Sequence, residues 1–397
     1  MNRRSFLTKL AGLGVPAMVA PKFAEAALPK AKVTRVRIYK PQEFNPTFNQ
    51  SNMVVTVETD IGLTGIGEGG SKDMLEQCAG SLIGQDPFRT EMLWGQMFKG
   101  WFYPPGREKI HAQGALDLAL WDLKGKALKR PVWRLLGGAH PRVPVYATFG
   151  FGFFDRDQLA AAAKLWVGQG FKRLKMTVGN EALRHRDARP VMEVIREDAA
   201  RVRAVREAVG IEVELFIDAN CNLDLYHATK LVEMVKPYGI SFFEEPLTQN
   251  DVPGMAQLRR ATGMALACGQ NEGLAFRFRD LLVSEAIDYA QPNVCITGGF
   301  SQCAKIAGMA SAFNVSIANG GAWGFHNMHL QAGVANGTLV EHHYLAVELY
   351  KQVFRGLPKP VDGHFTMSEA PGLGFEANRD AIREIAKLPL SQGRGKG

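Results

Sequence analysis

Residues with oxygen donors end three consecutive apolar runs in the middle of the sequence. They are Asp218 with Asn220, Glu244 with Glu245, and Gln270 with Glu272. If the runs are neighbouring parallel strands, their C-terminal ends meet at one edge, so one oxygen from each converges on a common point. Carboxylate and amide oxygens are the donors that Mg²⁺ prefers. A single such residue is more often a helix N-cap than a ligand, but the repetition predicts a site for one divalent cation, Mg²⁺.

Eight short apolar runs, separated by helical stretches, supply the strands that this site needs. Most steps between them are about 25 residues, which suits parallel β/α units that close into a barrel. An open, doubly wound sheet is the alternative, but no Gly-x-Gly-x-x-Gly motif opens a helix after the first run. We therefore predict an α/β fold with a TIM-type barrel over residues 139–345. The predicted strands are 143–149, 171–176, 213–218, 240–245, 265–270, 287–291, 315–318 and 339–343.

The residues before the barrel have a different pattern, with short β-rich segments followed by a long helical one. The β-rich segments, which predict an antiparallel meander, are 33–38, 53–59 and 63–67. Apolar residues at helical spacing predict a buried helix over 110–128. We therefore predict an α+β capping domain over residues 31–138, to which the C-terminal segment 346–397 returns.

The composition excludes several classes of protein. The chain has 397 residues, of which 46% are hydrophobic and 22% charged, as in an ordinary globular protein. Its net charge of +8 is not gathered into a run of Lys and Arg, so we do not expect a nucleic-acid partner. The five cysteines lack Cys-x-x-Cys spacing, so neither a disulfide framework nor a zinc cluster is predicted.

Residues 1–26 have the pattern of an export signal. The pair Arg3-Arg4 is followed by eleven uncharged residues, 10–20, and then by Ala24-Glu25-Ala26, an A-x-A cleavage site. Eleven residues are too few to span a bilayer, which takes about 20. No later segment reaches that length, so we expect no membrane span in the mature protein. The predicted destination is periplasmic or secreted, reached in the folded state by the twin-arginine route.

Several short motifs, spread over the chain, together resemble one family. They are Gly65-Ile66-Gly67-Glu68, Leu135-Leu136-Gly137-Gly138, Asp218-x-Asn220, Glu244-Glu245-Pro246 and Gly298-Gly299. In this combination the chain resembles the enolase superfamily, in its mandelate racemase/muconate lactonizing enzyme branch. The resemblance implies a modified (β/α)7β barrel, one Mg²⁺, and removal of a proton next to a substrate carboxylate. It also implies the metal ligands Asp218 and Glu244, with Gln270 at the third position, where the family usually has Glu. Glu272 is the alternative to Gln270, because it lies two residues on and so on the same face if the strand continues.

The usual proton-transfer positions of that family are altered in this chain. The second lysine of its Lys-x-Lys motif is Thr177, and the Asp and His of its opposite side are Asn293 and Gly320. None of these residues can serve as an unaided base at neutral pH. The remaining catalytic candidates are Lys175, His326 and Glu341. We expect a neighbouring cation to lower the pKa of Lys175, so that its amine can act as a base. A charged Lys175 would instead pair with the substrate carboxylate. We expect His326 to titrate near neutral pH.

These features predict a dehydratase or β-eliminating lyase that acts on a sugar acid or a related hydroxy acid. Elimination needs one good base, whereas racemisation needs groups on both faces of the substrate. The predicted substrate-binding residues are Asn220, Asn293, Tyr103 and Arg107. Two alternatives stay open: a racemase, epimerase or cycloisomerase of the same family, and a remodelled barrel that binds a small periplasmic acid without turnover. In each case we expect a small-molecule carboxylate as partner and a homo-oligomer.

Overall fold

The computed structural model describes residues 28–40, 53–99, 106–179 and 189–385. The predicted export signal at residues 1–26 lies outside the described residues, and so does Tyr103. In the described ranges, no helix combines the length and the apolar character that crossing a bilayer requires.

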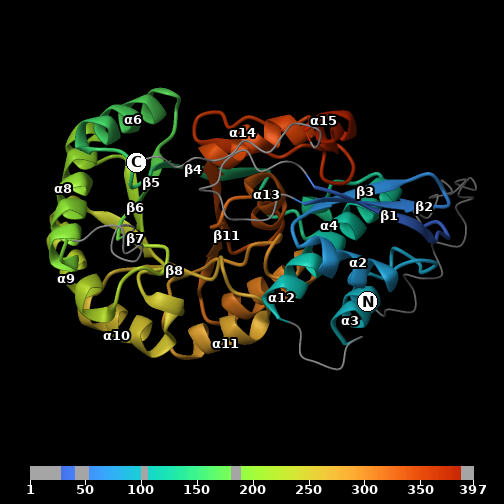
Figure 1. The fold of residues 1–397 in the computed structure, drawn as a ribbon, viewed down its shortest axis with the longest axis horizontal. Helices are drawn as coiled ribbons and strands as arrows, with labels where there is room; N and C mark the ends of the chain where they lie inside the picture. Colours follow the sequence, from blue (N-terminus) through green and yellow to red (C-terminus); the bar gives the residue numbers. More distant parts are fainter. Residues whose placement is uncertain (1–27, 41–52, 100–105, 180–188, 386–397) are drawn as a thin grey trace, which may run out of the picture.

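Eight parallel strands form a closed barrel in the second part of the chain (Figure 1). Each strand pairs with the next one along the sequence, and β11 pairs with β4 to close the ring. The strands are β4 (Arg142–Gly150), β5 (Arg173–Thr177), β6 (Glu214–Asp218), β7 (Ile240–Glu244), β8 (Leu266–Cys268), β9 (Tyr289–Ala290), β10 (Ser316–Ala318) and β11 (Gly337–His343). The predicted TIM-type barrel is therefore confirmed, with all eight strands where the apolar runs placed them.

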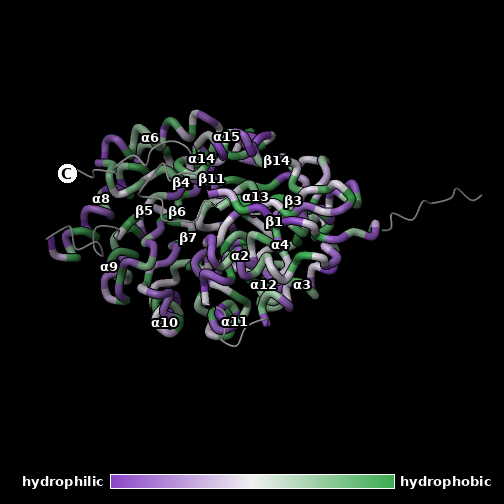
Figure 2. The backbone as a smooth tube through the Cα atoms, turned by 45° about the vertical axis from the view of Figure 1, so that its right-hand side comes forward, coloured by the Kyte–Doolittle hydropathy of each residue, from purple (hydrophilic) through white to green (hydrophobic). Residues whose placement is uncertain are grey.

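Helices connect the strands and cover the outside of the barrel. They are α6 (Arg156–Gly168), α8 (Val191–Val209), α9 (Leu225–Val235), η1 (Lys236–Tyr238), η2 (Thr248–Asn250), α10 (Val252–Thr262), α11 (Ala275–Val283), α12 (Gly299–Ala312), α13 (Gly324–Gly333) and α14 (Tyr344–Val353). Asp155, Asp224 and Asp251 begin three of them, each accepting a hydrogen bond from the backbone N–H three residues on. Hydrophilic and hydrophobic residues alternate along helices such as α8 and α9 (Figure 2), as expected for helices with one face on a core, whereas α13 is buried over its whole length.

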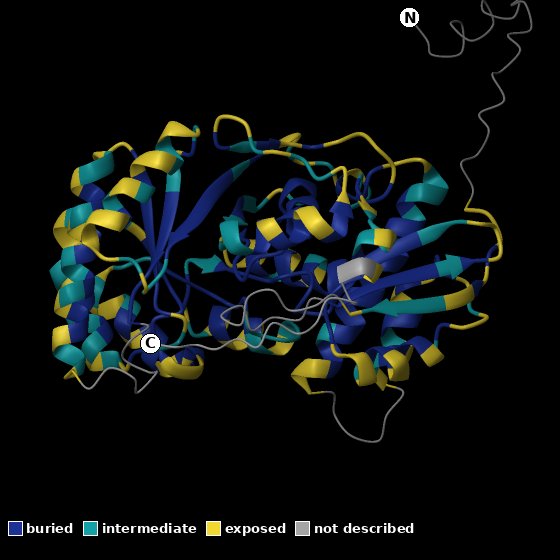
Figure 3. Cartoon of the chain, turned by 45° about the horizontal axis from the view of Figure 1, so that its top comes forward, coloured by how far each residue is buried: buried dark blue, intermediate teal, exposed yellow. Residues whose placement is uncertain are grey.

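The period of two along each strand divides its residues between two environments. On β4, Val145 and Ala147 belong to the core between barrel and helices. Tyr146 instead lies in the barrel interior with Phe216 and Phe242, whose rings stack with centroids 4.0 Å apart. The strands are buried along most of their length (Figure 3). An apolar layer therefore fills the barrel beneath the C-terminal ends of its strands.

The capping domain is a three-stranded antiparallel sheet packed against helices. Its elements are β1 (Val33–Tyr39), β2 (Val54–Thr59), β3 (Thr64–Glu68), α2 (Lys72–Gly80), α3 (Thr90–Lys99) and α4 (Arg107–Leu128), and α5 (Val132–Leu135) leads on to the barrel. The buried carboxylate of Asp117 on α4 accepts hydrogen bonds from Ser301 of α12, at 2.9 Å from its N–H and 2.6 Å from its hydroxyl. This contact fixes the capping domain to the barrel.

The C-terminal segment returns from the barrel to the capping domain. Its elements are β12 (Phe354–Arg355), β13 (His364–Thr366), β14 (Glu376–Ala377) and α15 (Arg379–Ile385). Strand β13 pairs antiparallel with the start of β4. Asp122 of α4 then accepts the N–H of Leu373 at 2.8 Å and the N–H of Ile66 at 3.0 Å. One buried carboxylate thus joins the C-terminal segment to β3.

Strand β3 packs against α4 at a distance that only glycine allows. A Cβ on Gly65 would lie 2.0 Å from the carbonyl oxygen of Ala119, and a Cβ on Gly67 would lie 1.9 Å from that of Ala115. This close approach determines where the end of β3, and with it Glu68, meets the barrel.

Gly67→Ala is expected to lower the free energy of unfolding by about 1–3 kcal/mol, because the added methyl must push α4 away from the sheet. The matched control is Gly80→Ala at the end of α2, where a Cβ would meet no heavy atom within 4 Å. That control should be neutral or stabilise the protein by up to about 1 kcal/mol. Urea unfolding followed by circular dichroism measures both variants. Equal free energies would contradict the close packing of β3 on α4.

Candidate active site

A buried lysine at the end of β5 lies among three carboxylates. Lys175 Nζ is 2.6 Å from Glu244 Oε1. It also lies 3.1 Å from both Asp218 Oδ2 and Glu341 Oε1. All of these side chains are buried. The structure therefore brings together four of the predicted site residues at the C-terminal end of the barrel.

The charges of this cluster keep the lysine protonated. Burial disfavours the ammonium, but the negative charges of Glu244 and Glu341 outweigh it and raise the pKa of Lys175 well above its ordinary value. The expectation of a lowered pKa is therefore wrong for this site, because it counted a neighbouring cation and left out the carboxylates. Burial raises the pKa of Glu244. The burial of Glu341 is outweighed by the charge of Lys175, so the pKa of Glu341 is lowered.

Hydrogen-bond donors orient the two carboxylates that come from β6 and β7. Asp218 accepts the N–H of Asn220 at 2.8 Å and its Nδ2 at 3.1 Å. Gln291 Nε2 donates to Glu244 Oε2 at 2.9 Å. In-register pairing of Asp218 with Glu244 places the two side by side at the barrel mouth. Both carboxylates are therefore held in fixed positions before any ligand binds.

Glu341 on β11 is held on both of its carboxylate oxygens. Oε1 accepts the hydroxyl of Thr148 at 2.5 Å and is the atom that faces Lys175. Oε2 accepts the N–H of Ala322 at 2.6 Å. This geometry makes Glu341 a fixed partner of Lys175 and a brace for the loop at Ala322.

The third position of the predicted metal site is occupied by Gln270. Its Nε2 donates to Glu245 Oε2 at 2.6 Å, which leaves Oε1 as the atom available to a cation. Glu272 instead accepts from Asn250 Nδ2 at 3.1 Å and lies 3.5 Å from Arg277 Nε. The geometry therefore favours Gln270 over Glu272.

Asp218, Glu244 and Gln270 fit a Mg²⁺ ion by their chemistry. Each offers a hard oxygen at a neighbouring strand end. In the described part of the chain, no group of three or more His, Cys, Asp or Glu side chains is arranged to hold a metal. A site with two carboxylates and one amide oxygen is consistent with that finding.

The residues at the family's usual base positions are bound to the protein backbone. Thr177 donates its hydroxyl to the carbonyl of Gly150 at 3.0 Å. Asn293 Nδ2 donates to the carbonyl of Gly320 at 2.7 Å and to those of the two following residues. Asn293 Oδ1 accepts the N–H of Cys295 at 3.0 Å. Because both ends of its amide bind the protein, Asn293 clamps the loop after β10, and we do not carry it forward as a substrate-binding residue.

His326 lies apart from this cluster. It is buried in α13, with its ring against Phe354 and Phe375 and its Nδ1 3.5 Å from Glu68 Oε2. Burial lowers the pKa of His326 to about 3. A neutral ring enclosed by Glu68 of the capping domain and by Phe354 and Phe375 of the C-terminal segment is not placed to reach a substrate at the strand ends, so we do not carry it forward as a proton-transfer group.

The other predicted substrate-binding residues have different positions. Asn220 lies in the site, in the left-handed backbone region with φ 45°, where it is bound to Asp218. Arg107 is exposed at the first residue of α4, and its role stays a prediction. Tyr103 lies outside the described residues.

Two family models together match most of the chain. Residues 32–137 match the mandelate racemase/muconate lactonizing enzyme N-terminal domain, and residues 158–381 match the enolase C-terminal domain-like family. The chain belongs to the enolase superfamily. Its branch is that of mandelate racemase and muconate lactonizing enzyme, so the resemblance carried by the motifs is confirmed.

Named relatives in the superfamily include enzymes of sugar acids. A D-galactonate dehydratase of Pectobacterium atrosepticum is 30% identical over 90% of this chain and 94% of its own. An arabinonate dehydratase of Saccharolobus solfataricus is 29% identical over 83% of this chain and 89% of its own. Among solved structures, the 3,6-anhydro-D-galactonate cycloisomerase of Zobellia galactanivorans superposes with a TM-score of 0.79 at 29% identity, covering 89% of this chain and 99% of its own.

Two residues of this enolase-superfamily site were given no role from the sequence. Glu245 is buried and accepts hydrogen bonds from Gln270 and from two asparagine amides, and burial raises its pKa to about 7. His343 follows Glu341 by two positions on β11, and its ring centroid lies 5.2 Å from that of Phe151. Residues two positions apart on a strand face the same side, so counting two onward from Glu341 would have identified His343.

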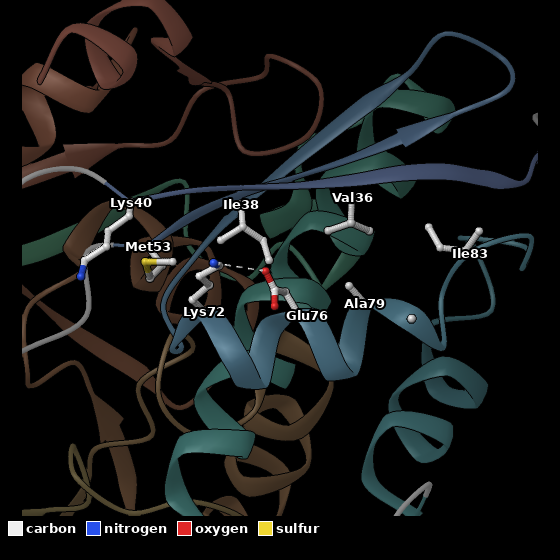
Figure 4. A pocket seen from close by; sticks show the side chains of 9 residues that line it. Val36, Ile38, Lys40, Met53, Lys72, Glu76, Ala79 and Ile83 are labelled. Carbon is white, nitrogen blue, oxygen red and sulfur yellow. Dashed lines mark ion pairs between the residues drawn. The ribbon is translucent and has the colours of Figure 1, made fainter. Parts of the chain in front are cut away.

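A groove of about 620 Å³ lies in the capping domain, between β1 and α2 (Figure 4). Apart from Lys40 it is mainly apolar, with one ion pair of 3.8 Å between Lys72 and Glu76. It contains none of the residues around Lys175. The lining residues are Val36, Ile38, Lys40, Met53, Lys72, Glu76, Ala79, Gly80 and Ile83.

Lys175→Met is expected to lower the free energy of unfolding of metal-free protein by about 3–5 kcal/mol, because three buried carboxylates lose their cation. The control is Lys230→Met on α9, whose ion pair with Glu233 is on the surface and should contribute almost nothing. Urea unfolding at neutral pH in a chelator measures both. A Lys175→Met variant as stable as wild type would show that the carboxylates do not depend on the ammonium.

Proposed function

We propose that this protein is a sugar-acid dehydratase, which removes the proton α to a carboxylate and eliminates the β-hydroxyl. The observation that carries the proposal is the buried Lys175, held between Asp218, Glu244 and Glu341 at the barrel mouth. Relatives named D-galactonate dehydratase and arabinonate dehydratase, which align over most of the chain, support it.

We also propose one Mg²⁺, held by Asp218, Glu244 and Gln270. When bound, such a cation stabilises the negative charge that develops on the substrate carboxylate as the α-proton leaves. The support is the set of three hard oxygen donors at consecutive strand ends. Because Gln270 is neutral, the donor set carries one negative charge fewer than three carboxylates would. We therefore expect weaker Mg²⁺ binding than in a site with three acidic ligands.

The protein's own residues favour elimination over racemisation. The protonated Lys175 is bound by Asp218, Glu244 and Glu341, so it is not available to take a proton from either face of the α-carbon. Racemisation needs a proton donor on one face of that carbon and an acceptor on the other. On one side, the hydroxyl of Thr177 is bound to a backbone carbonyl. On the other side, the amide of Asn293 is bound to the carbonyl of Gly320, which has no side chain. These residues supply neither a donor nor an acceptor for the proton.

Cycloisomerisation is the second candidate, because one superposed structure is a 3,6-anhydro-D-galactonate cycloisomerase. Opening an anhydro ring by β-elimination starts with the same removal of an α-proton. Only the leaving group differs, since a ring oxygen departs in place of a hydroxyl. The same arrangement around Lys175 would serve both reactions, so the substrate panel must include both kinds of acid.

The purified protein with Mg²⁺ is expected to convert at least one acid from a panel of D-galactonate, arabinonate, other aldonates, uronates and 3,6-anhydrogalactonate. The product of elimination is a 2-keto-3-deoxy acid, which semicarbazide detects by absorbance. A chelator should abolish turnover and added Mg²⁺ should restore it. Binding of an acid without any product would favour the non-catalytic alternative.

The ligand assignment is tested in the same protein by titration calorimetry with Mg²⁺. Asp218→Ala and Glu244→Ala should lose measurable binding, and Gln270→Ala should weaken it. Glu272→Ala is the control and should bind like wild type. Unchanged affinity in both carboxylate variants would remove the proposed metal site. The expected homo-oligomer also stays a prediction, which light scattering tests.

We propose that the protein is exported through the twin-arginine route to the periplasm or the medium. The support is the order of the pair Arg3-Arg4, the uncharged segment 10–20 and the cleavage motif ending at Ala26.

In cell fractionation, wild-type protein should appear outside the cytoplasm, and N-terminal sequencing should place its first residue after Ala26. A variant with Arg3→Lys and Arg4→Lys keeps the charge and should accumulate in the cytoplasm at full length. Lys9→Arg is the control and should be exported normally. Export of the double variant at the wild-type level would contradict the route, and full-length wild type in the cytoplasm would contradict export itself.

A further inference from the structure

His343 continues the inward-facing row of β11. Leu339 belongs to the apolar layer inside the barrel, and Glu341 faces Lys175. His342 points the other way, with its ring against Trp166 and Phe171 on the outside of the barrel. The alternation along the strand therefore directs His343 to the inside, one step closer to the mouth than Glu341.

The surroundings of His343 are those of the site itself. It is opposite Thr148 in the pairing of β11 with β4, and its ring is 5.2 Å from that of Phe151 just beyond β4. The charges that act on it come from Glu341 on its own strand, Lys175 on β5 and Asp218 on β6. The charge of His343 also acts on the neighbouring His342, whose ring packs on the other side of the strand. His343 is half-buried.

Glu341 and Lys175, the other catalytic candidates of the cluster, are bound to protein groups. Glu341 is bound on both oxygens by Thr148, Ala322 and Lys175. Lys175 makes contacts with three carboxylates. The family's usual base positions hold Thr177, Asn293 and Gly320, which cannot transfer a proton.

We propose that His343 is the proton-transfer residue of this protein, in place of the bases that the sequence lacks. The proposal rests on the dehydratase function proposed above and names the group that performs it. Neutral His343 takes the α-proton of a 2,3-dihydroxy acid through one ring nitrogen. The electron pair of that C–H bond forms the C2–C3 double bond as the C3–O bond breaks. The leaving hydroxyl takes the proton from the imidazolium and departs as water, and the enol becomes a 2-keto-3-deoxy acid.

The protonation state of His343 is also compatible with the role of base. Burial lowers its pKa, and although Glu341 acts in the opposite direction, the net shift is downward. At neutral pH the imidazole is therefore uncharged and can accept a proton. The same ring returns to this state once water leaves, so no second acid is needed.

The test uses the purified protein with Mg²⁺ and the acid of the panel that wild type converts fastest. His343→Asn should lower kcat by at least about 10²-fold, the usual effect of losing a positioned base, with little change in KM. His343→Ala should be equally slow and should recover part of its turnover when free imidazole is added. His342→Asn is the matched control, because this neighbour faces the helices, and it should keep wild-type kcat. Circular dichroism and Mg²⁺ binding check that each variant is folded.

Each result bears on one proposal. Turnover by wild type together with near wild-type kcat in both His343 variants would overturn the role of His343 and leave the dehydratase function standing. A slow His343→Ala variant that imidazole does not rescue, with a KM raised in proportion, would assign His343 to substrate binding and overturn proton transfer. No product from any acid with wild type would overturn the dehydratase function, and the role of His343 with it.

Discussion

The ion pairs of Lys175 are the interaction on which the site depends. Three buried carboxylates within about 3 Å of one ammonium repel one another and are costly to desolvate, so removing the cation leaves them uncompensated. The second oxygens of Glu244 and Glu341 bind Gln291 and the backbone at Ala322. A further cation would favour the ionised form of Glu244, whose pKa burial raises. The geometry of the cluster is thus fixed in advance of the ligands that it must bind.

The barrel makes this arrangement possible because it brings residues that are distant in sequence together at the C-terminal ends of its strands. Tyr146, Phe216 and Phe242 fill the interior below the charges, and Lys175 Nζ lies 5.4 Å from the centre of the Tyr146 ring. The apolar layer excludes water from beneath, so the ion pairs act in a medium of low polarity. The Tyr146 hydroxyl also donates to the carbonyl of Asn319 at 2.5 Å. The same layer therefore braces the loop after β10.

The sequence allowed prediction of the strands and of Asp218 and Glu244, because apolar runs and their polar ends follow a regular period. It did not allow the placement of His326, which depends on the turn just before α13. There Ala322 and Trp323 adopt positive φ values of 63° and 52°, and this turn carries His326 toward Glu68 instead of the strand ends. His343 was missed because two adjacent histidines face opposite sides of β11. His343 can be told from His342 only when it is known which residues of β11 face the barrel interior.

The departures at positions 270, 293 and 320 are physically linked. Gln270 donates to Glu245, where a glutamate would set two carboxylates against each other. A Cβ on Gly320 would lie 2.7 Å from Gln291 Nε2 and 3.1 Å from Gln270 Oε1, so a histidine there requires the two amide side chains to move. Asn293 in turn clamps the carbonyls of this loop. The side of the barrel where the family usually keeps its histidine is therefore lined by these three amides, and the proposed proton transfer is assigned to another strand. Among the described strands, β11 carries an inward-facing histidine, His343, opposite Thr148 and beside Phe151, so the proposed base lies on a side of the barrel that these amides do not line.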